Sequence, residues 1–340
     1  MVRQGASSVL RRAVVSGAAG FIGSRLVNLL AGQGVHVVAL TRDPSKGKLV
    51  SVETGIEWRQ VDFRLSRDIG PVCQGATTVF HLAGYAHAED ANDDAASALH
   101  GVITVEGTRA LINEAVRAGV QHFVFVSSAK VMGEASDYCL NERAPISPAT
   151  AYSRAKYEAE KIVLGSGAAH GMHVTVLRLP LVYGPGNKGN LRRMIEAIDC
   201  GRFPSLPETN NKRSLVHVDD VVQALGLAVA NPKASGEVYF VTDGHIYSTF
   251  QICRLIRSAL GRAEPKWSVP IRILRAVTMV GDAIGMARGR PIFINSLALN
   301  KLIHSAWYSS EKIERELGFK PTYTLQTALP QIIKAYRREK

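Results

Sequence analysis

Short apolar runs alternate with amphipathic stretches over about the first half of the chain. The runs have the length and the β-branched character of buried strands. We predict strands at residues 13–15, 35–40, 56–61, 78–82, 121–127 and 172–179, with helices between them, the longest over about residues 95–118. Strands that alternate with helices predict a parallel, doubly wound α/β sheet, whose ligand crevice lies at the carboxyl ends of the strands.

The pattern changes after Tyr183. Residues 184–190 form a glycine-rich loop, a helix is expected from Leu191, and a strand at residues 213–218 leads into another helix. Short strands and helices are mixed in the rest of the chain. We therefore predict a parallel-sheet domain over residues 1–182 and a smaller mixed α/β region over residues 183–340. This second region is expected to be partly interleaved with the first and to bind the substrate.

The most apolar late stretch is Ile271–Ala287. It contains Arg272, Arg275 and Asp282 and is shorter than the roughly 20 apolar residues that a membrane span needs. We predict a packed amphipathic helix and no integral membrane segment, with contact to a membrane surface as the alternative. The start of the chain lacks the apolar core of a signal peptide, so we expect a cytoplasmic protein.

The composition narrows the choice of partners. A chain of 340 residues with 46% hydrophobic content can bury a full core. A net charge of +12 suits nucleic acid, anionic lipid or phosphorylated small molecules. The basic residues are spread along the chain and no basic-aromatic motif is present, which disfavours nucleic acid. The four cysteines are far apart with no CxxC pair, so we expect no metal site.

Three glycines follow the first predicted strand, at positions 17, 20 and 23. Gly17 permits a tight turn, Gly20 lets the backbone approach a pyrophosphate, and Gly23 lets the next helix pack closely on the strand. The helix that begins near Phe21 and Ile22 offers N–H donors and the positive end of its dipole. This arrangement predicts a dinucleotide site, and the first domain is then a Rossmann domain.

The end of the second strand bears on the choice of dinucleotide. Enzymes that use NAD usually place a carboxylate there to hold the ribose diol, whereas this chain has Thr41 and Arg42. A guanidinium suits a 2′-phosphate, and Lys46 and Lys48 are close in sequence. We expect NADP(H) to be preferred, with NAD(H) as the alternative because Asp43 is near enough to reach the ribose.

The ends of the next two strands complete the predicted cofactor site. Asp62 and Phe63 follow the third strand and are well placed for the adenine. The fourth strand ends in small and apolar residues that let the backbone lie against the cofactor, namely Leu82, Ala83 and Gly84. His81, just before them, is expected to pack against the sheet and not to act in catalysis.

Tyr152 and Lys156 are four residues apart and share one face of a predicted helix. A phenol has a reference pKa of about 10, and a nearby ammonium group stabilises the phenolate and lowers that pKa. Ser128, at the end of the fifth strand, can hold a substrate carbonyl or alcohol beside the tyrosine. Such a set predicts acid–base chemistry coupled to hydride transfer.

These motifs together resemble the extended short-chain dehydrogenase/reductase family, and the likeness covers about residues 12–317. Besides the residues above, it rests on Tyr183-Gly184-Pro185 and on the run from Arg213 to Asp220. The most similar branch acts on nucleotide sugars. The resemblance implies that Tyr152 is the acid/base, that Lys156 holds the nicotinamide ribose and tunes the tyrosine, and that Ser128 binds the substrate oxygen.

The resemblance also implies further contacts. Pro180 would lie near the nicotinamide, and the nucleotide diphosphate would be bound by Lys188, Asn190, Leu191 and Arg213, with Lys130 also facing the substrate. A homodimer through the helices near residues 95–118 and 151–165 is expected. Two departures are Thr104, where an asparagine is usual, and Leu181-Val182, which replace another asparagine.

One further departure narrows the reaction. The 4,6-dehydratases of this family have Thr-Asp-Glu where this chain has Ser128-Ala129-Lys130. Water elimination needs an acid and a base at the last two positions, so a dehydratase is disfavoured. The resemblance favours an NAD(P)H-dependent reductase of a UDP-linked 4-keto-6-deoxy amino sugar for surface polysaccharide. The alternatives are a UDP-hexose 4-epimerase with tightly bound NAD, a hydroxysteroid dehydrogenase and a non-catalytic dinucleotide sensor.

Overall fold

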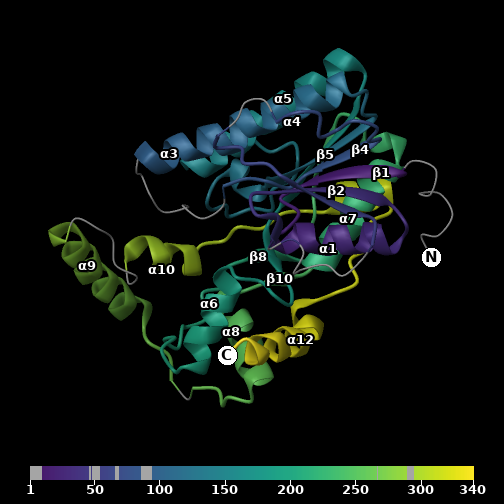
Figure 1. Ribbon diagram of the computed structural model, residues 1–340. Coiled ribbons are helices and arrows are strands. Elements are labelled where there is room, and N and C mark those ends of the chain that lie inside the picture. The colour runs from purple at the N-terminus through teal and green to yellow at the C-terminus, as the bar shows by residue number, and fades with distance from the viewer. Residues whose placement is uncertain are drawn as a thin grey trace.

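The computed structural model describes residues 10–45, 47, 54–65, 69–85, 94–265, 267–288 and 295–340. Lys46 and Lys48 lie outside the described residues. Figure 1 shows a layered molecule, with helices packed on a central sheet and a smaller group of helices and short strands below it.

The central sheet has seven parallel strands in the order β3-β2-β1-β4-β5-β6-β9, which confirms the predicted doubly wound α/β fold. The strands are β1 (Arg12–Ser16), β2 (His36–Thr41), β3 (Ile56–Gln60), β4 (Thr78–His81), β5 (His122–Ser128), β6 (His173–Leu179) and β9 (Glu237–Phe240). The chain reverses its direction across the sheet between β1 and β4. A crevice for a ligand forms at such a switch point, at the carboxyl ends of the strands.

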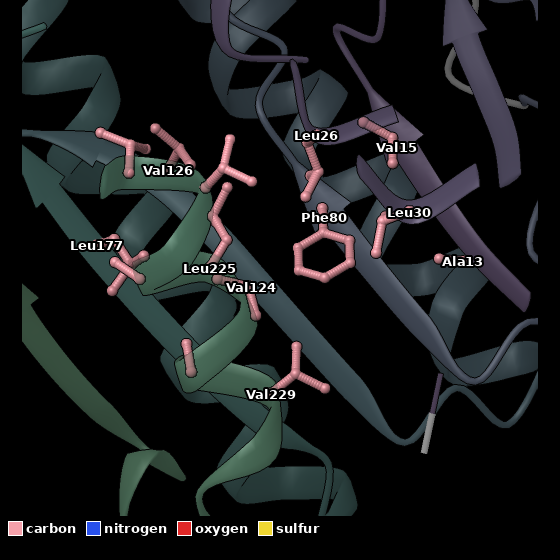
Figure 2. Packing of buried hydrophobic residues seen from close by; sticks show 14 of the residues in the cluster. Ala13, Val15, Leu26, Leu30, Phe80, Val124, Val126, Leu177, Leu225 and Val229 are labelled. Atoms are coloured by element: carbon pink, nitrogen blue, oxygen red, sulfur yellow. The ribbon is translucent and has the colours of Figure 1, made fainter. Parts of the chain in front are cut away.

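Helices cover both faces of this sheet. On one face, α1 (Phe21–Gly32) and α7 (Val218–Ala230) pack side by side. Figure 2 shows Phe80 of β4 between leucines of these two helices, Leu26 and Leu30 on one side and Leu225 on the other. On the opposite face lie α4 (Gly107–Arg117) and α5 (Ala151–His170).

A three-stranded sheet forms the centre of the smaller region. Strand β8 (Arg213–His217) pairs in parallel with β7 (Leu181–Tyr183) and antiparallel with β10 (Ile246–Tyr247). A separate apolar cluster joins it to three helices: α6 (Asn190–Asp199), α8 (Thr249–Leu260) and α12 (Leu325–Arg338). α7 and β9 follow residue 183 in the sequence but pack with the seven-stranded sheet. The domain boundary at residue 182 stays a prediction.

The helix predicted over residues 95–118 consists of three segments. They are α3 (Asp94–His100), a π-helical segment η1 (Gly101–Glu106) and α4. Local π-helical geometry rotates the residues that follow it and often occurs near functional sites. The short remaining elements are η2 (Ala129–Met132), η3 (Pro232–Ala234) and α11 (Glu311–Leu317).

The helix predicted at the late apolar stretch exists as α9 (Ile271–Ala287) and packs against a neighbouring helix. The helix packs through small residues and not, as expected of an amphipathic helix, through its large apolar side chains. Its large apolar side chains are mostly exposed, and Figure 1 shows it at the edge of the molecule beside α10 (Ser296–Ile303). Its buried positions are Thr278, Gly281 and Gly285. Small residues there let the helix approach its neighbour without burying its apolar bulk. Among the described helices, none combines the length and the hydropathy that crossing a bilayer requires.

Candidate active site

The glycine turn links β1 to α1 at the carboxyl edge of the central sheet. Gly17 has a φ of +69°, and its carbonyl accepts a 2.9 Å hydrogen bond from the Gly20 amide. A Cβ atom at Gly23 would collide with the Gly17 carbonyl oxygen, and one at Gly17 would lie 2.9 Å from the amide nitrogen of Ala83. The turn therefore needs glycine for its conformation and for its close approach to the β4 loop.

The N-terminus of α1 fits an anionic group. Gly20 is its N-cap and presents no side chain to the first turn, where no acidic residue lies. Phe21 and Ile22 open the helix with backbone N–H groups that have no partner within it. A free helix N-terminus above a glycine cradle fits a dinucleotide pyrophosphate.

The end of β2 presents Arg42 to solvent beside the half-buried Thr41. The neighbouring Asp43 carboxylate accepts hydrogen bonds from the Ser45 amide at 3.1 Å and from the Ser45 hydroxyl at 2.5 Å. These bonds hold the carboxylate within its own turn. The Arg42 guanidinium is exposed at this strand end, and its charge acts on the nearby Asp62 carboxyl group.

Asp62 and Phe63 follow β3. Asp62 forms a 2.5 Å ion pair with Arg64, and that hydrogen-bonded guanidinium lowers the pKa of the carboxyl group. The Phe63 side chain is buried against Gly107 of α4, where an added Cβ would lie 3.0 Å from the phenylalanine. Phe63 can therefore meet an adenine only through its backbone.

A chain of buried hydrogen bonds holds the β4 loop. The Ser16 hydroxyl oxygen accepts from the amides of Leu82 and Ala83 at 3.1 Å, and its distance to His81 Nδ1 is 2.6 Å. His81 Nε2 lies 2.9 Å from the hydroxyl of Thr108. That hydroxyl donates to the Thr104 carbonyl at 2.5 Å.

These hydrogen bonds show which nitrogen of His81 carries the proton. Burial, with a smaller contribution from Lys156, lowers its pKa to about 3. The imidazole is neutral. Because the Ser16 oxygen already accepts from two amides, its hydroxyl donates a hydrogen bond to His81 Nδ1, and His81 Nε2 donates to Thr108. His81 is completely buried, and its role is to position the loop that carries Leu82, Ala83 and Gly84.

The three residues of the predicted acid–base set come from two neighbouring elements. Ser128 ends β5, and its hydroxyl accepts a 3.3 Å hydrogen bond from the Lys130 amide. Tyr152 is in the first turn of α5, which Thr150 caps in a reciprocal pair with Ser153. The cap fixes where the helix begins and so places Tyr152 at the crevice.

Lys156 extends from the next turn of α5 to β5. Its Nζ donates a 2.9 Å hydrogen bond to the carbonyl of Val126 and lies 4.7 Å from the centre of the Phe125 ring. A Cβ atom at Gly84 would lie 3.1 Å from this nitrogen. The β4 loop, Lys156 and β5 therefore meet at one point. Burial lowers the pKa of Lys156 to about 8, partly opposed by the Glu160 carboxylate.

Glu160, one turn beyond Lys156, forms a buried ion pair with Arg178 of β6. Arg178 donates to it from Nε at 3.0 Å and from Nη2 at 2.7 Å, and the Ser127 hydroxyl donates at 2.5 Å. Both charged side chains are at most 5% exposed. This network ties α5 to β5 and β6 directly behind the lysine. No sequence motif indicates this ion pair, although Lys156 and Glu160 are one helical turn apart.

Two further aromatic residues, which no sequence motif indicates, pack in a row that ends at Tyr152. The buried His100, at the end of α3, has its ring centre 5.7 Å from that of Tyr152 and 5.0 Å from that of Tyr85. Tyr85 follows Gly84, and its amide lies 3.5 Å from the Thr104 hydroxyl. Neither residue belongs to a motif that sequence spacing could have identified.

The predicted substrate residues are less closely grouped. Lys188 and Asn190 are exposed at the start of α6, whereas the Leu191 side chain is buried in the cluster around α6, α8 and α12. Leu191 can therefore contact a ligand only through its backbone. Lys130 lies 3.9 Å from Glu134. Arg213 donates to the His304 carbonyl at 3.2 Å, and burial lowers the pKa of its guanidinium.

Pro180 lies next to Ser128 across the sheet, because Leu179 pairs with Ser128 in the β5–β6 register. It is half-buried between β6 and β7. The structure thus brings the glycine turn, the β4 loop, Ser128, Lys156 and Pro180 to one edge of the sheet. Within the described residues, no cluster of histidine, cysteine and acidic side chains is suited to hold a metal ion.

The fold and the crevice are those of a dinucleotide-dependent enzyme of the extended short-chain dehydrogenase/reductase type. The chain belongs to the NAD dependent epimerase/dehydratase family, whose model matches residues 13–242. It is 28% identical to a UDP-glucose 4-epimerase of Vibrio cholerae over 95% of this chain and 94% of that protein. It is equally 28% identical to a 3 beta-hydroxysteroid dehydrogenase/Delta 5-->4-isomerase of Mycobacterium tuberculosis, over 96% and 90%.

Solved structures agree. The complex of MoeE5 with UDP-glucuronic acid and NAD superimposes with a TM-score of 0.76 and 25% identity, covering 97% of this chain and 100% of that chain. The family expected from the sequence is therefore confirmed, and nucleotide-sugar enzymes are among its distant homologues.

Proposed function

We propose that this protein is an NAD(P)H-dependent reductase of a nucleotide-linked 4-keto-6-deoxy (amino) sugar, used in surface polysaccharide biosynthesis. The observation that supports this most is the meeting of Lys156, Gly84 and the end of β5 at the crevice beside the glycine turn. Tyr152 and Ser128 flank that point on α5 and β5. A bound dinucleotide, held by Gly17, Gly20 and Gly23, would supply the hydride.

The residues of this chain manage the oxygen and its proton. The Ser128 hydroxyl donates a hydrogen bond to the C4 carbonyl oxygen of the substrate. As C4 receives the hydride, that oxygen gains negative charge, and the Tyr152 hydroxyl transfers its proton to it. Lys156 stabilises the resulting phenolate by its positive charge.

The residues at the end of β2 support a reductase over an epimerase. Arg42 is exposed there, and Asp43 is engaged by Ser45. An exposed guanidinium favours the 2′-phosphate of NADPH, which cells use as a dissociable reductant. We therefore propose NADP(H) as the preferred cofactor, with NAD(H) as the alternative.

A dehydratase would need an acid and a base at positions 129 and 130, and the residues there cannot serve as this pair. Ala129 is buried and cannot ionise, and Lys130 is a cation near Glu134. The basic side chains of Lys188 and Arg213 suit a diphosphate, and an apolar steroid would need a different lining. The acid–base set also argues against a non-catalytic sensor.

A UDP-hexose 4-epimerase is the second candidate, favoured by the full-length similarity to the Vibrio cholerae epimerase. It would use the same three residues but return the hydride to the other face of the ketone, so NAD would stay bound. Protein purified with stoichiometric, non-dialysable NAD would favour the epimerase.

The decisive experiment incubates the purified protein with UDP- and dTDP-linked hexoses and their 4-keto-6-deoxy derivatives, and follows NADPH and NADH by absorbance. The proposal predicts that a 4-keto sugar consumes NADPH, and that Tyr152→Phe lowers this turnover by about 10²–10⁴-fold, the usual contribution of a general acid. Interconversion of C4 epimers without consumption of reductant would instead establish the epimerase.

A further inference from the structure

An apolar stripe runs along the outer face of α9. Ile273, Val277, Val280 and Ile284 follow the spacing of one helix face, and each is 44% to 60% exposed. Met279 and Met286 extend the exposed apolar surface, at 67% and 78%. Apolar patches of this kind on a protein surface mark contact sites, because isolated solvent exposure of so many large side chains is unfavourable.

An adjacent face of the helix already has its partner. Thr278, Gly281 and Gly285 are buried on the side of α10, and the Asp282 carboxylate accepts a 3.2 Å hydrogen bond from the Ser296 amide at the start of α10. The helix is therefore oriented by α10, which leaves the stripe exposed to solvent. Figure 1 shows α9 at the edge of the molecule. Trp267, just before α9, and Leu297 on α10 are exposed as well.

The charges around the stripe have one sign. Exposed arginines stand at both ends of α9, with Arg272 in the first turn and Arg288 at the C-cap. Asp282 is the only acidic residue between positions 266 and 290, and it faces α10. Arginines that flank an apolar stripe can place their guanidinium groups among lipid headgroups while the stripe enters the acyl boundary.

Charge also decides between a lipid surface and a second copy of the chain. If two copies met through this stripe, arginines would face arginines in either orientation, with no outward carboxylate on the helix to balance them. Like charges brought together in an interface are unfavourable. An anionic bilayer supplies the missing negative charge, and the whole chain has a net charge of +12.

We propose that α9 docks this protein on an anionic lipid surface, lying in the plane of the interface with its apolar stripe facing the bilayer. This property is independent of the reaction. Its location has a consequence for the site, since α10, which supports α9, is followed by His304, whose carbonyl accepts a hydrogen bond from Arg213. The helix that supports the docked face is thus linked by one hydrogen bond to Arg213 of the proposed substrate pocket.

Vesicle flotation tests the proposal with the full-length protein. We expect it to float with vesicles of equal parts phosphatidylcholine and phosphatidylglycerol, and at least tenfold less with phosphatidylcholine alone. The double variant Val277→Asp/Ile284→Asp should lose at least tenfold of the anionic binding. The matched control, Leu65→Asp/Tyr138→Asp, alters two exposed apolar residues elsewhere and should float like the wild type.

Circular dichroism and thermal unfolding of both double variants show whether they are folded. The proposal is overturned if the wild type does not float, if the folded stripe variant floats as well as the wild type, or if neutral vesicles bind equally. Sedimentation velocity of the wild type and the stripe variant gives a further test of the proposal, because it measures their oligomeric state. A wild-type dimer that the stripe variant dissociates, with no vesicle binding, would make the stripe an interface between copies.

Discussion

The imidazole of His100 meets the phenol of Tyr152 nearly edge-on, with ring centres 5.7 Å apart and ring planes at 64°. His100 lies at the junction of α3 with the π-helical segment, and Tyr85, which follows the β4 loop, packs on its ring. The phenol that we propose as the proton donor therefore packs against a helix that contributes no residue to the proposed chemistry.

His100→Ala should reduce turnover by making Tyr152 less well placed. An edge-to-face aromatic pair contributes about 0.5–1.5 kcal/mol, which corresponds to roughly a 2- to 12-fold lower kcat, while the KM for the nucleotide sugar changes little. His100→Phe, which keeps a ring in place, should recover most of the rate in steady-state assays. An equally low kcat for both variants would contradict a positioning role.

The charge of Lys156 should set the alkaline limit of activity. Its pKa is lowered to about 8 by burial, so the ammonium that stabilises the Tyr152 phenolate is lost as the pH rises through that value. We expect kcat/KM for the 4-keto sugar to fall above about pH 8 by roughly tenfold per pH unit, since this ratio reports groups of the free enzyme. Lys156→Arg, slower but permanently charged, should lack this decline.

The same titration affects stability with the opposite sign. Below about pH 8 the folded protein keeps a buried ammonium that burial disfavours. Between about pH 8 and the reference pKa of 10.5, the unfolded chain holds a proton that the folded chain has released. The Lys156 contribution to the free energy of unfolding therefore rises with pH in this window. Denaturant titrations of wild type and Lys156→Met, compared at pH 7 and pH 9.5, measure it as a difference.

Arg42→Ala should separate the two dinucleotides. Loss of a hydrogen-bonded charge contact costs about 1.5–3 kcal/mol, so the Kd for NADPH should rise by roughly 10- to 150-fold while that for NADH changes little. Fluorescence titration with each dinucleotide measures both constants, and Arg338→Ala, an exposed arginine at the end of α12, is the control. Equal losses for NADPH and NADH would refute the cofactor assignment.

Glu160→Ala should destabilise the protein strongly because it leaves the buried Arg178 guanidinium without its carboxylate. Breaking a buried pair in this way costs about 3–5 kcal/mol of unfolding free energy. Glu158→Ala on the same helix removes the partner of Lys161 in an exposed pair and should cost at most about 1 kcal/mol. Urea unfolding of the two variants gives the comparison, and similar losses for both would rule out the buried pair as a major stabilising contact.

The strands and the chemical motifs could be predicted because their signals are local. Apolar runs such as that of β5, the glycine spacing of the first turn and the four-residue step from Tyr152 to Lys156 all lie within single elements or their ends. The parallel sheet then places strand ends on one edge, so the predicted cofactor residues gather there. Phe63 and Leu191 show the limit, since their side chains turn into the core.

The sequence by itself determined the family and the sheet and predicted the acid–base residues, since these depend on periodicity and on spacing within short segments. Only the tertiary structure decided that His100 adjoins Tyr152, that Glu160 pairs with Arg178 and that α9 leaves its apolar face outside. The physical reason is that burial and pairing depend on which distant segments share a surface. In α9 the small residues Thr278, Gly281 and Gly285 face α10, and the larger side chains are left exposed.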